Sequence, residues 1–431
     1  RQVSSAASDV YKRQDLMSRV SYVMMHPEGA ELLTSAIREA INGLFVELTS
    51  EASNQVEDIL EIALVANPIM HHIVLGINPV NLGTAPFALT TSDAIDTRAA
   101  EMGLNAHPEA RLYCLPCIAG HVGADAAGVI LAEAPDRNED MTLIVDVGTN
   151  AEIVLANSER LLVCSSPTGP AFEGAQVSSG QRATIGAIER VQIDRETLEP
   201  RFKCIGSELW SDEPGFTETM AGTGVTGICG SGIIEVVAEM YLAGILSTDG
   251  VVDGALAERN QRIQADGRTF SYVLHVSSDP EVSDVLVTQN DVRQIQLAKA
   301  ALYAGIKLLM DEMGVATVDR IRLAGAFGSH ISVSHAMVLG LIPDCDLEQV
   351  TSAGNAAGAG ARMALLDRNA RLEIAATIAK AERIETAVAD DFQAHFVGAM
   401  GLPHQSDPFP NLFSVVSPPA AKVVESGDTP K

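Results

Sequence analysis

Short apolar runs alternate with polar turns between residues 143 and 165. The run LIVDV at 143–147 is followed by a turn, by a second run, AEIVL, at 151–155 and, after the turn ANSER, by a third run, LLVCS, at 161–165. Such runs between turn residues are typical of buried strands. We therefore expect three consecutive antiparallel strands. This order excludes a Rossmann start and a Walker A loop, because both pass from a strand through a glycine loop directly into a helix.

Helical spacing of apolar residues appears in three longer segments. Residues 32–50 form one expected helix, and a glycine-rich loop from 222 opens into an amphipathic helix that runs to 240. In 294–313 the expected core stripe consists of Ile295, Ala298, Leu302, Gly305 and Leu309. Lys299 and Lys307 lie off this stripe, so we expect both on the surface of the protein.

Turn and loop signals divide the chain into four parts. A polar loop marks a boundary near residue 138. The segment before residue 15 has no initiator Met and no apolar period, and the segment after 406 is rich in Pro and Ser. We predict an artefactual leader at 1–14, a middle region at 15–138, a C-terminal lobe at 139–405, and a docking segment with a flexible tail at 406–431. Inside the middle region we expect strands at 57–66 and 111–118 and a helix that reaches about residue 134.

Composition narrows the class of protein. Hydrophobic residues make up 47% of the 431 residues, which is enough for a large core, and the 4% of aromatic residues suits closely packed α/β layers. The net charge of −27 would repel nucleic acid and anionic membranes. No apolar run reaches the roughly 18–20 residues that span a bilayer, and no secretory signal is visible. We therefore expect a cytoplasmic protein without nucleic-acid or membrane partners.

Six cysteines and one His-His pair are the first candidates for metal or redox chemistry. The cysteines are scattered, which suits a reducing compartment better than a disulfide framework. Cys114 and Cys117 form a C-x-x-C pair without a second pair, so we expect a structural role. Adjacent side chains point in different directions in a strand or a helix. Structural or substrate-positioning roles are therefore favoured for His71 and His72 over a shared metal.

The turn between the first two expected strands carries the most informative chemistry. Asp146 can hold Mg²⁺ directly or through its waters. Gly148 lets the backbone approach a ligand closely, and Thr149 with the nearby N–H groups can donate to phosphate oxygens. Ordinary turns use the same residue types for their geometry, so the turn alone leaves both interpretations open.

Later segments add further candidate residues. A rigid turn at 168–174 carries Glu173. The helix that starts at Gly230 and Ser231 offers unpaired N–H groups to an anion, although its glycines could equally serve close helix–sheet packing. An expected strand ends in two glycines, Gly325 and Gly328, which leave room for a flat ring beside the backbone.

In this order, the hairpin, the helix start, the strand end and a later helix of small residues resemble the sugar kinase, heat-shock chaperone and actin superfamily of ATPases. The resemblance implies an α/β fold of two ribonuclease-H-like lobes that close on Mg-ATP, with the first lobe truncated at its N-terminus. Residues 120–125 and 354–361 resemble the starts of its two connecting helices. The resemblance assigns Asp146, Gly148, Thr149 and Asn150 to the second phosphate motif, and Gly325, Ala326, Phe327 and Gly328 to the adenosine motif.

Longer segments resemble one family of this superfamily, the reductive activators of corrinoid proteins. They are GPAFEGAQVSSGQRATIGAIERV (169–191), GICGSGIIEVVAEM (227–240), TQNDVRQIQLAKAAL (288–302), LAGAFGSHISVSHAMVLGLIPD (323–344) and ETAVADDFQAHFVGAMGLPHQSDPFPNL (385–412). In the middle region NPIMHHIVLGINPVNLGTAPF (67–87) and LPCIAGHVGADAAGVILA (115–132) also match the pattern of that family. The resemblance covers about residues 15–412.

This resemblance implies an activity. It is the ATP-dependent return of cobalt(II) corrinoid proteins of methyltransferase systems to cobalt(I), with electrons from an N-terminal ferredoxin-like [2Fe–2S] domain. ATP and Mg²⁺ are the implied cofactors, a corrinoid protein is the implied partner, and a homodimer is a further candidate assembly. Asp146 and Glu173 would be the catalytic residues, with Asp146 as the metal ligand. The nucleotide would contact Gly148, Thr149, Asn150, Gly230, Ser231, Gly325, Ala326, Phe327 and Gly328.

The sequence also departs from the family pattern. It contains no C-x₄-C-x₂-C loop for the cluster and no first DxGTT hairpin. Asp15 to Arg19 resembles the stretch that normally follows that hairpin. We therefore expect the C-terminal part of a longer protein, with no cluster of its own, weak nucleotide binding and negligible turnover. Two alternatives are an activator of another low-potential enzyme, of the 2-hydroxyacyl-CoA dehydratase type, and a non-catalytic nucleotide-sensing module that binds a partner. A third alternative, a sugar or acetate kinase, has no recognisable substrate-recognition motif in this sequence.

Overall fold

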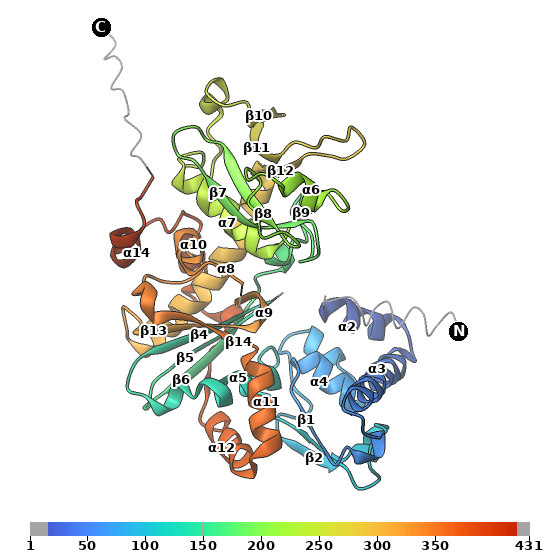
Figure 1. Ribbon diagram of the computed structural model, residues 1–431. Coiled ribbons are helices and arrows are strands. Elements are labelled where there is room, and N and C mark those ends of the chain that lie inside the picture. Colours follow the sequence, from blue (N-terminus) through green and yellow to red (C-terminus); the bar gives the residue numbers. More distant parts are fainter. Residues whose placement is uncertain (1–15, 149, 329, 420–431) are drawn as a thin grey trace. The chain divides into compact units, whose positions relative to one another are not determined.

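The chain forms two compact units in a computed structural model that describes residues 16–148, 150–328 and 330–419 (Figure 1). The first unit comprises Arg1–Ser166, Leu308–Ser329 and Thr351–Ala389, and the second comprises Pro167–Lys307, His330–Val350 and Asp390–Lys431. The expected leader at 1–14, Thr149 and the last part of the expected tail lie outside the described residues.

The first unit is built on a six-stranded sheet with the order β14-β13-β4-β5-β6-β15. Strands β4 (Thr142–Val147), β5 (Ala151–Ala156) and β6 (Leu161–Ser166) are consecutive and antiparallel, which confirms the three predicted strands. Two later strands extend the sheet in parallel: β13 pairs with β4, and β15 pairs with β6. The remaining bounds are β13 (Arg320–Ala324), β14 (Val350–Gly354) and β15 (Glu382–Arg383).

Two helices of small residues pack against each other beside this sheet. They are α5 (Ala124–Glu133) and α11 (Ala356–Leu366), and α12 (Arg368–Ile378) lies next to both (Figure 1). Asn355 begins α11, because its side chain accepts a hydrogen bond from the Gly358 N–H at 2.9 Å. The two backbones approach so closely that a Cβ on Gly360 would overlap the carbonyl oxygen of Gly128. Small residues are therefore required at this crossing.

We expect Gly360→Ala to destabilise the protein by about 1–3 kcal/mol, because the added methyl group has no space at the crossing. Gly43→Ala is the matched control. It also lies inside a helix, but a Cβ there meets no atom within 4 Å. That control should gain about 0.5–1 kcal/mol from the lower backbone entropy of the unfolded chain. Urea unfolding of both variants measures these opposite changes in stability. Equal changes in the two variants would contradict the close contact of α5 and α11 at Gly360.

Besides α5, the middle region contributes a smaller sheet and three further helices to the first unit. Its strands have the order β1-β3-β2, with bounds β1 (Glu61–Leu64), β2 (Ile95–Arg98) and β3 (Arg111–Cys114). The helices are α2 (Leu16–Met25), α3 (Gly29–Glu51) and α4 (Pro68–Leu75). The strands expected at 57–66 and 111–118 are shorter than predicted. In the first, a turn of 3-10 helix occupies Val56–Asp58, and Pro68 opens α4.

The second unit contains two three-stranded sheets and the long helix α8 (Gln289–Met313) from its start to Lys307 (Figure 1). One sheet has the order β8-β7-β9 and the other the order β10-β11-β12. The strand bounds are β7 (Ala187–Ile193), β8 (Pro200–Cys204), β9 (Gly227–Ile228), β10 (Ile263–Asp266), β11 (Thr269–His275) and β12 (Val285–Thr288). Short helices complete the fold: α6 (Phe216–Met220), α7 (Gly230–Leu242), α9 (Gly325–Gly328, in the first unit), α10 (Val333–Leu339), α13 (Phe392–Gly398) and α14 (Pro410–Val415).

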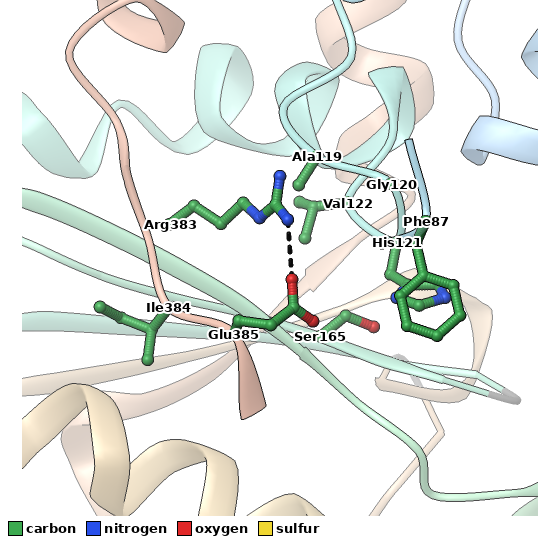
Figure 2. Close-up of a pocket in the computed structure, with 9 residues that line it drawn as sticks. All are labelled: Phe87, Ala119, Gly120, His121, Val122, Ser165, Arg383, Ile384 and Glu385. Carbon is green, nitrogen blue, oxygen red and sulfur yellow. Dashed lines mark hydrogen bonds and ion pairs between the residues drawn. The ribbon is translucent and has the colours of Figure 1, made fainter. Parts of the chain in front are cut away.

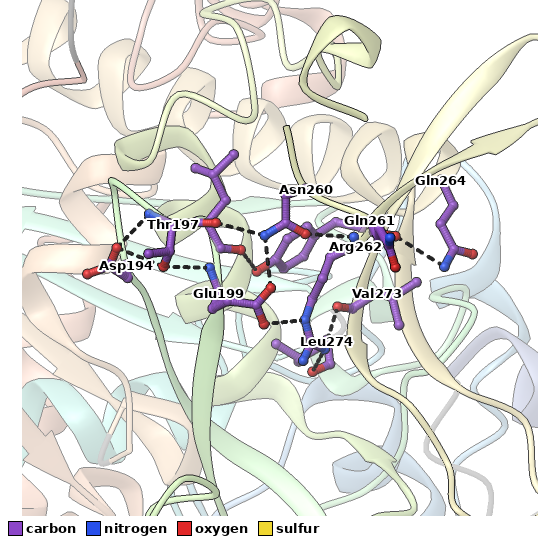
Figure 3. A network of polar contacts seen from close by, with 11 residues as sticks. Asp194, Thr197, Glu199, Asn260, Gln261, Arg262, Gln264, Val273 and Leu274 are labelled. Atoms are coloured by element: carbon purple, nitrogen blue, oxygen red, sulfur yellow. Dashed lines mark hydrogen bonds and ion pairs between the residues drawn. The ribbon is translucent and has the colours of Figure 1, made fainter. Parts of the chain in front are cut away.

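Polar side chains join the two sheets of the second unit (Figure 3). Asn260 donates to the carbonyl oxygen of Thr197 at 2.7 Å and to Glu199 at 2.9 Å. Arg262 reaches the other oxygen of the Glu199 carboxylate at 2.7 Å. Tyr272, which is fully buried, donates its hydroxyl to the carbonyl oxygen of Leu198 at 2.9 Å. The turn between β7 and β8 is thus held against β10 and β11.

The prediction that Lys299 lies on the surface of α8 is wrong. The predicted core stripe is buried, but Lys299 is buried as well, with 0% of its surface exposed. Its ammonium group donates to the carbonyl oxygens of Gly401 and Pro403, the latter at 2.7 Å. A second segment of the chain covers this face of the helix, and burial lowers the pKa of Lys299 to about 7. No helix among the described residues is long and apolar enough to span a membrane.

Candidate functional site

The candidate site lies where two parallel strands of the six-stranded sheet end. Asp146 on β4 pairs in register with Ala324 on β13, and Gly325 follows directly. The carboxyl ends of parallel strands in open α/β sheets are the usual place for a ligand. The structure therefore brings together the first residues of two predicted motifs, Asp146 and Gly325.

Gly325 and Asp146 are in close contact. Gly325 adopts φ +81°, a conformation that residues with a side chain rarely adopt. A Cβ on Gly325 would overlap Oδ1 of Asp146 and would lie 3.5 Å from its Cγ. Any other residue at this position would collide with the carboxylate.

The turn that follows Asp146 is tight. The N–H of Gly148 donates to the carbonyl oxygen of Asn150 at 3.0 Å, and Val147 pairs with Ala151 to close the hairpin. Gly148 and Asn150 are both partly exposed. Thr149 is outside the described residues, and for Ala326 and Phe327 only the backbone, in α9, is described.

Two further carboxylates, which are not among the predicted site residues, accompany Asp146. Glu152 is the direct cross-strand partner of Asp146, and Ser165 is the partner of Glu152, so all three side chains lie on one face of the sheet. The Ser165 hydroxyl lies 3.4 Å from Glu152 Oε1. Asp125, in the first turn of α5, is close enough for its charge to act on both other carboxylates. We call Asp125, Asp146 and Glu152 the carboxylate cluster.

Burial and mutual repulsion raise the pKa values of the three carboxyl groups in this cluster. Burial first, and then the charge of Asp125, raises the pKa of Asp146 to about 6. Burial, followed by the charges of Asp125 and Asp146, raises the pKa of Glu152 well above its usual value. Burial also raises the pKa of Asp125. Within the described part of the chain no Lys, Arg or His forms an ion pair with these three groups, so a bound cation would relieve their repulsion.

A small cavity lies near the ends of β6 and β15 in the same unit (Figure 2). Figure 2 shows Arg383 facing the carboxylate of Glu385, an ion pair of 2.7 Å, with Ser165 beside it and the rings of His121 and Phe87 together at one side. The cavity measures about 10 Å³, which is room for roughly one water molecule. It is far too small for a nucleotide. Its link to the candidate site is Ser165, which also faces Glu152.

Gly328 ends α9 in the first unit, and the remaining predicted residues lie in the second unit. Glu173 ends the 3-10 helix Pro170–Glu173, and Gly230 and Ser231 open α7 as predicted. Ser231 is buried, with its hydroxyl 3.4 Å from the Cys229 sulfur. Nearly every residue of α7 is buried, so the expected amphipathic pattern is wrong for this helix. The catalytic role of Glu173 and the contact of Gly230 and Ser231 with a nucleotide stay predictions.

The cysteines and the His71–His72 pair lie in buried surroundings that suit a structural role. All six cysteines are free and buried, and burial raises the pKa of Cys114 and Cys117 to about 12. His72 is held through both ring nitrogens, by the Pro68 carbonyl at 2.9 Å and the Thr90 N–H at 3.1 Å. Across the described residues no three His, Cys, Asp or Glu side chains are grouped to hold a metal ion by themselves.

The fold is that of an ASKHA domain, and comparison with known proteins confirms this class. Residues 140–413 match the sequence model of the C-terminal domain of RACo, the ASKHA domain, and residues 3–138 match that of the RACo middle region. The chain therefore belongs to the RACo family, as the sequence motifs predicted.

Three relatives carry informative names. The corrinoid activation enzyme RamQ of Eubacterium limosum is 32% identical over 82% of this chain and 58% of its own length. The [Co(II) methylated amine-specific corrinoid protein] reductase of Methanosarcina barkeri is 26% identical over 72% of this chain and 56% of its own. A solved structure, a reductive activator for corrinoid, iron-sulfur protein, matches with a TM-score of 0.76 and 31% identity over 90% of this chain and 60% of its own. The chain thus spans a little over half the length of these relatives.

Proposed function

We propose that this protein takes part in the ATP-dependent reductive activation of cobalt(II) corrinoid proteins of methyltransferase systems. The observation that carries the proposal is the strand-end site, where Asp146 meets Gly325 inside a fold whose relatives are named as corrinoid activators and a corrinoid protein reductase. The electrons would come from a [2Fe–2S] domain that is not part of this sequence. A cytoplasmic location fits this proposal.

The chemistry of the Asp146 carboxylate fits a hard divalent cation such as Mg²⁺. Oxygen ligands are what Mg²⁺ prefers, and it is normally held by one or two carboxylates together with waters and substrate phosphates. Asp146 is the proposed ligand, and Mg²⁺ would neutralise phosphate charge when bound. Glu173 remains a proposed catalytic residue beside Asp146. Gly148, Thr149 and Asn150, together with the candidate residues of α7 and α9, remain the proposed nucleotide contacts.

ATP can promote activation only if it binds one arrangement of the partners better than another. The cobalt(II) corrinoid protein is the proposed partner, and the strength of its binding should therefore depend on Mg-ATP. A homodimer is compatible with this scheme.

Isothermal titration with Mg-ATP and with a cobalt(II) corrinoid protein tests the proposal. We expect the chain to bind the corrinoid protein, to bind it with a different affinity when Mg-ATP is present, and to phosphorylate no sugar. The same corrinoid protein in its cobalt(I) state is the control for recognition of the inactive form. Failure to bind the cobalt(II) protein with and without Mg-ATP would overturn the proposed function.

A further inference from the structure

We propose that Gly325 is a positioning residue for the carboxylate of Asp146: the bare backbone at the end of β13 fixes where the proposed metal ligand on β4 points. This inference rests on the proposed function for its consequence in nucleotide binding. The contact itself can be tested without nucleotide.

The Asp146 carboxylate contacts the backbone of Gly325 and has two further carboxylates nearby. The space that a Cβ on Gly325 would fill is taken by Oδ1 of Asp146. Glu152 is the cross-strand neighbour of Asp146, and Asp125 also acts on it electrostatically. A side chain at position 325 would push the Asp146 carboxylate out of its place, and movement toward the other two carboxylates would increase their repulsion.

The strand register explains why this glycine can set the position of a residue so far away in the sequence. Five consecutive pairs, from Arg320 with Thr142 to Ala324 with Asp146, tie β13 to β4. The backbone of residue 325 therefore arrives at a fixed height beside Asp146, and it turns away at once into α9 through its positive φ. Because the strands are joined by hydrogen bonds, neither backbone can shift alone to accommodate a side chain.

Gly314 offers a matched control in the same unit. It also has a positive φ, +74°, but a Cβ there would meet no atom within 4 Å. Gly325→Ala and Gly314→Ala therefore impose the same kind of backbone strain. Only Gly325→Ala brings a methyl group onto the Asp146 carboxylate.

The first test is a double-mutant cycle on thermal unfolding of the whole chain. We expect Gly325→Ala to lower Tm more than Gly314→Ala does. In the Asp146→Ala background that excess should disappear, because the carboxylate has been removed, whereas the effect of Gly314→Ala should be the same in both backgrounds. An equal Tm loss from Gly325→Ala with and without Asp146 would overturn the positioning role.

The second test measures nucleotide affinity with and without Mg²⁺. Gly325→Ala should weaken Mg-ATP binding by roughly 10–100-fold, the usual loss when a group that orients a metal ligand is changed. It should affect metal-free ATP binding much less. Loss of the glycine's own proposed contact with the nucleotide would weaken binding equally with and without Mg²⁺, as would a purely structural defect. The excess loss in the presence of Mg²⁺ therefore reports the displaced Asp146 carboxylate. Gly314→Ala should preserve both affinities. If the unchanged chain binds no ATP, the proposed function fails, while the unfolding cycle still decides the role of Gly325.

Discussion

Replacing Asp146 with Ala is expected to weaken Mg-ATP binding by about 100-fold or more and to abolish every effect of ATP on the corrinoid partner. The magnitude follows because changes in groups that merely support a metal ligand already cost roughly 10–100-fold. Asp146 is the carboxylate that β13 and the tight turn hold at the strand end. Titration calorimetry with Mg-ATP measures the loss.

The same substitution should make the empty protein more stable at neutral pH. The pKa of Asp146 is raised in the folded state, to about 6. The folded protein therefore binds protons more tightly than the unfolded chain, and the unfolding free energy falls as pH rises from about 4 to 6. Above pH 6 the ionised Asp146 lowers the unfolding free energy by about 3 kcal/mol. Each unit by which its pKa in the folded protein exceeds that in the unfolded chain corresponds to about 1.4 kcal/mol. Asp146→Ala should recover much of that amount at pH 7 and little of it at pH 4.

Asp93→Ala serves as the control for both measurements. Asp93 is exposed and lies in the same unit. Its replacement removes one negative charge without touching the carboxylate cluster. It should change neither Mg-ATP affinity nor the pH dependence of stability. An equal loss of Mg-ATP binding in Asp93→Ala and Asp146→Ala would contradict the proposal that Asp146 is the metal ligand.

The strand–turn–strand pattern was enough to predict β4, β5 and β6 and the place of Asp146 at a strand end. It was not enough to predict Glu152. Asp146 and Glu152 become cross-strand partners only in the register of this hairpin, in which Val147 pairs with Ala151. Had the loop been shorter by one residue, Glu152 would face the other side of the sheet.

Residues that come from distant segments were beyond the reach of local patterns. Asp125 joins the cluster because α5 packs beside the sheet, and the apolar periodicity of α5 carries no information about that partner. Lys299 was misplaced for the same reason. An apolar stripe predicts one buried face of a helix. It cannot indicate that a distant segment, around residues 401 and 403, packs against another face and buries it as well.

Acidification is expected to destabilise the middle region through His71. This side chain on α4 is completely buried, and neither ring nitrogen has a hydrogen-bond partner among the described residues. Burial first, and then the neighbouring His72, lowers the pKa of His71 from 6.5 to about 4. The unfolded chain therefore takes up a proton at higher pH than the folded protein does. The contribution of His71 to stability is intact above pH 6.5 and is lost as pH falls toward 4.

The loss amounts to about 3 kcal/mol over this range, since each pH unit between the two pKa values corresponds to about 1.4 kcal/mol. His71→Leu should remove the pH dependence due to this residue. It should also raise stability at pH 7, because a buried polar group without a partner is replaced by an apolar one. His330→Leu, at an exposed position, is the control and should leave the pH profile unchanged. Urea unfolding between pH 4 and 7 decides the matter: parallel profiles for the protein and its His71→Leu variant would mean that the ring acquires a proton in the folded state as easily as in the unfolded chain.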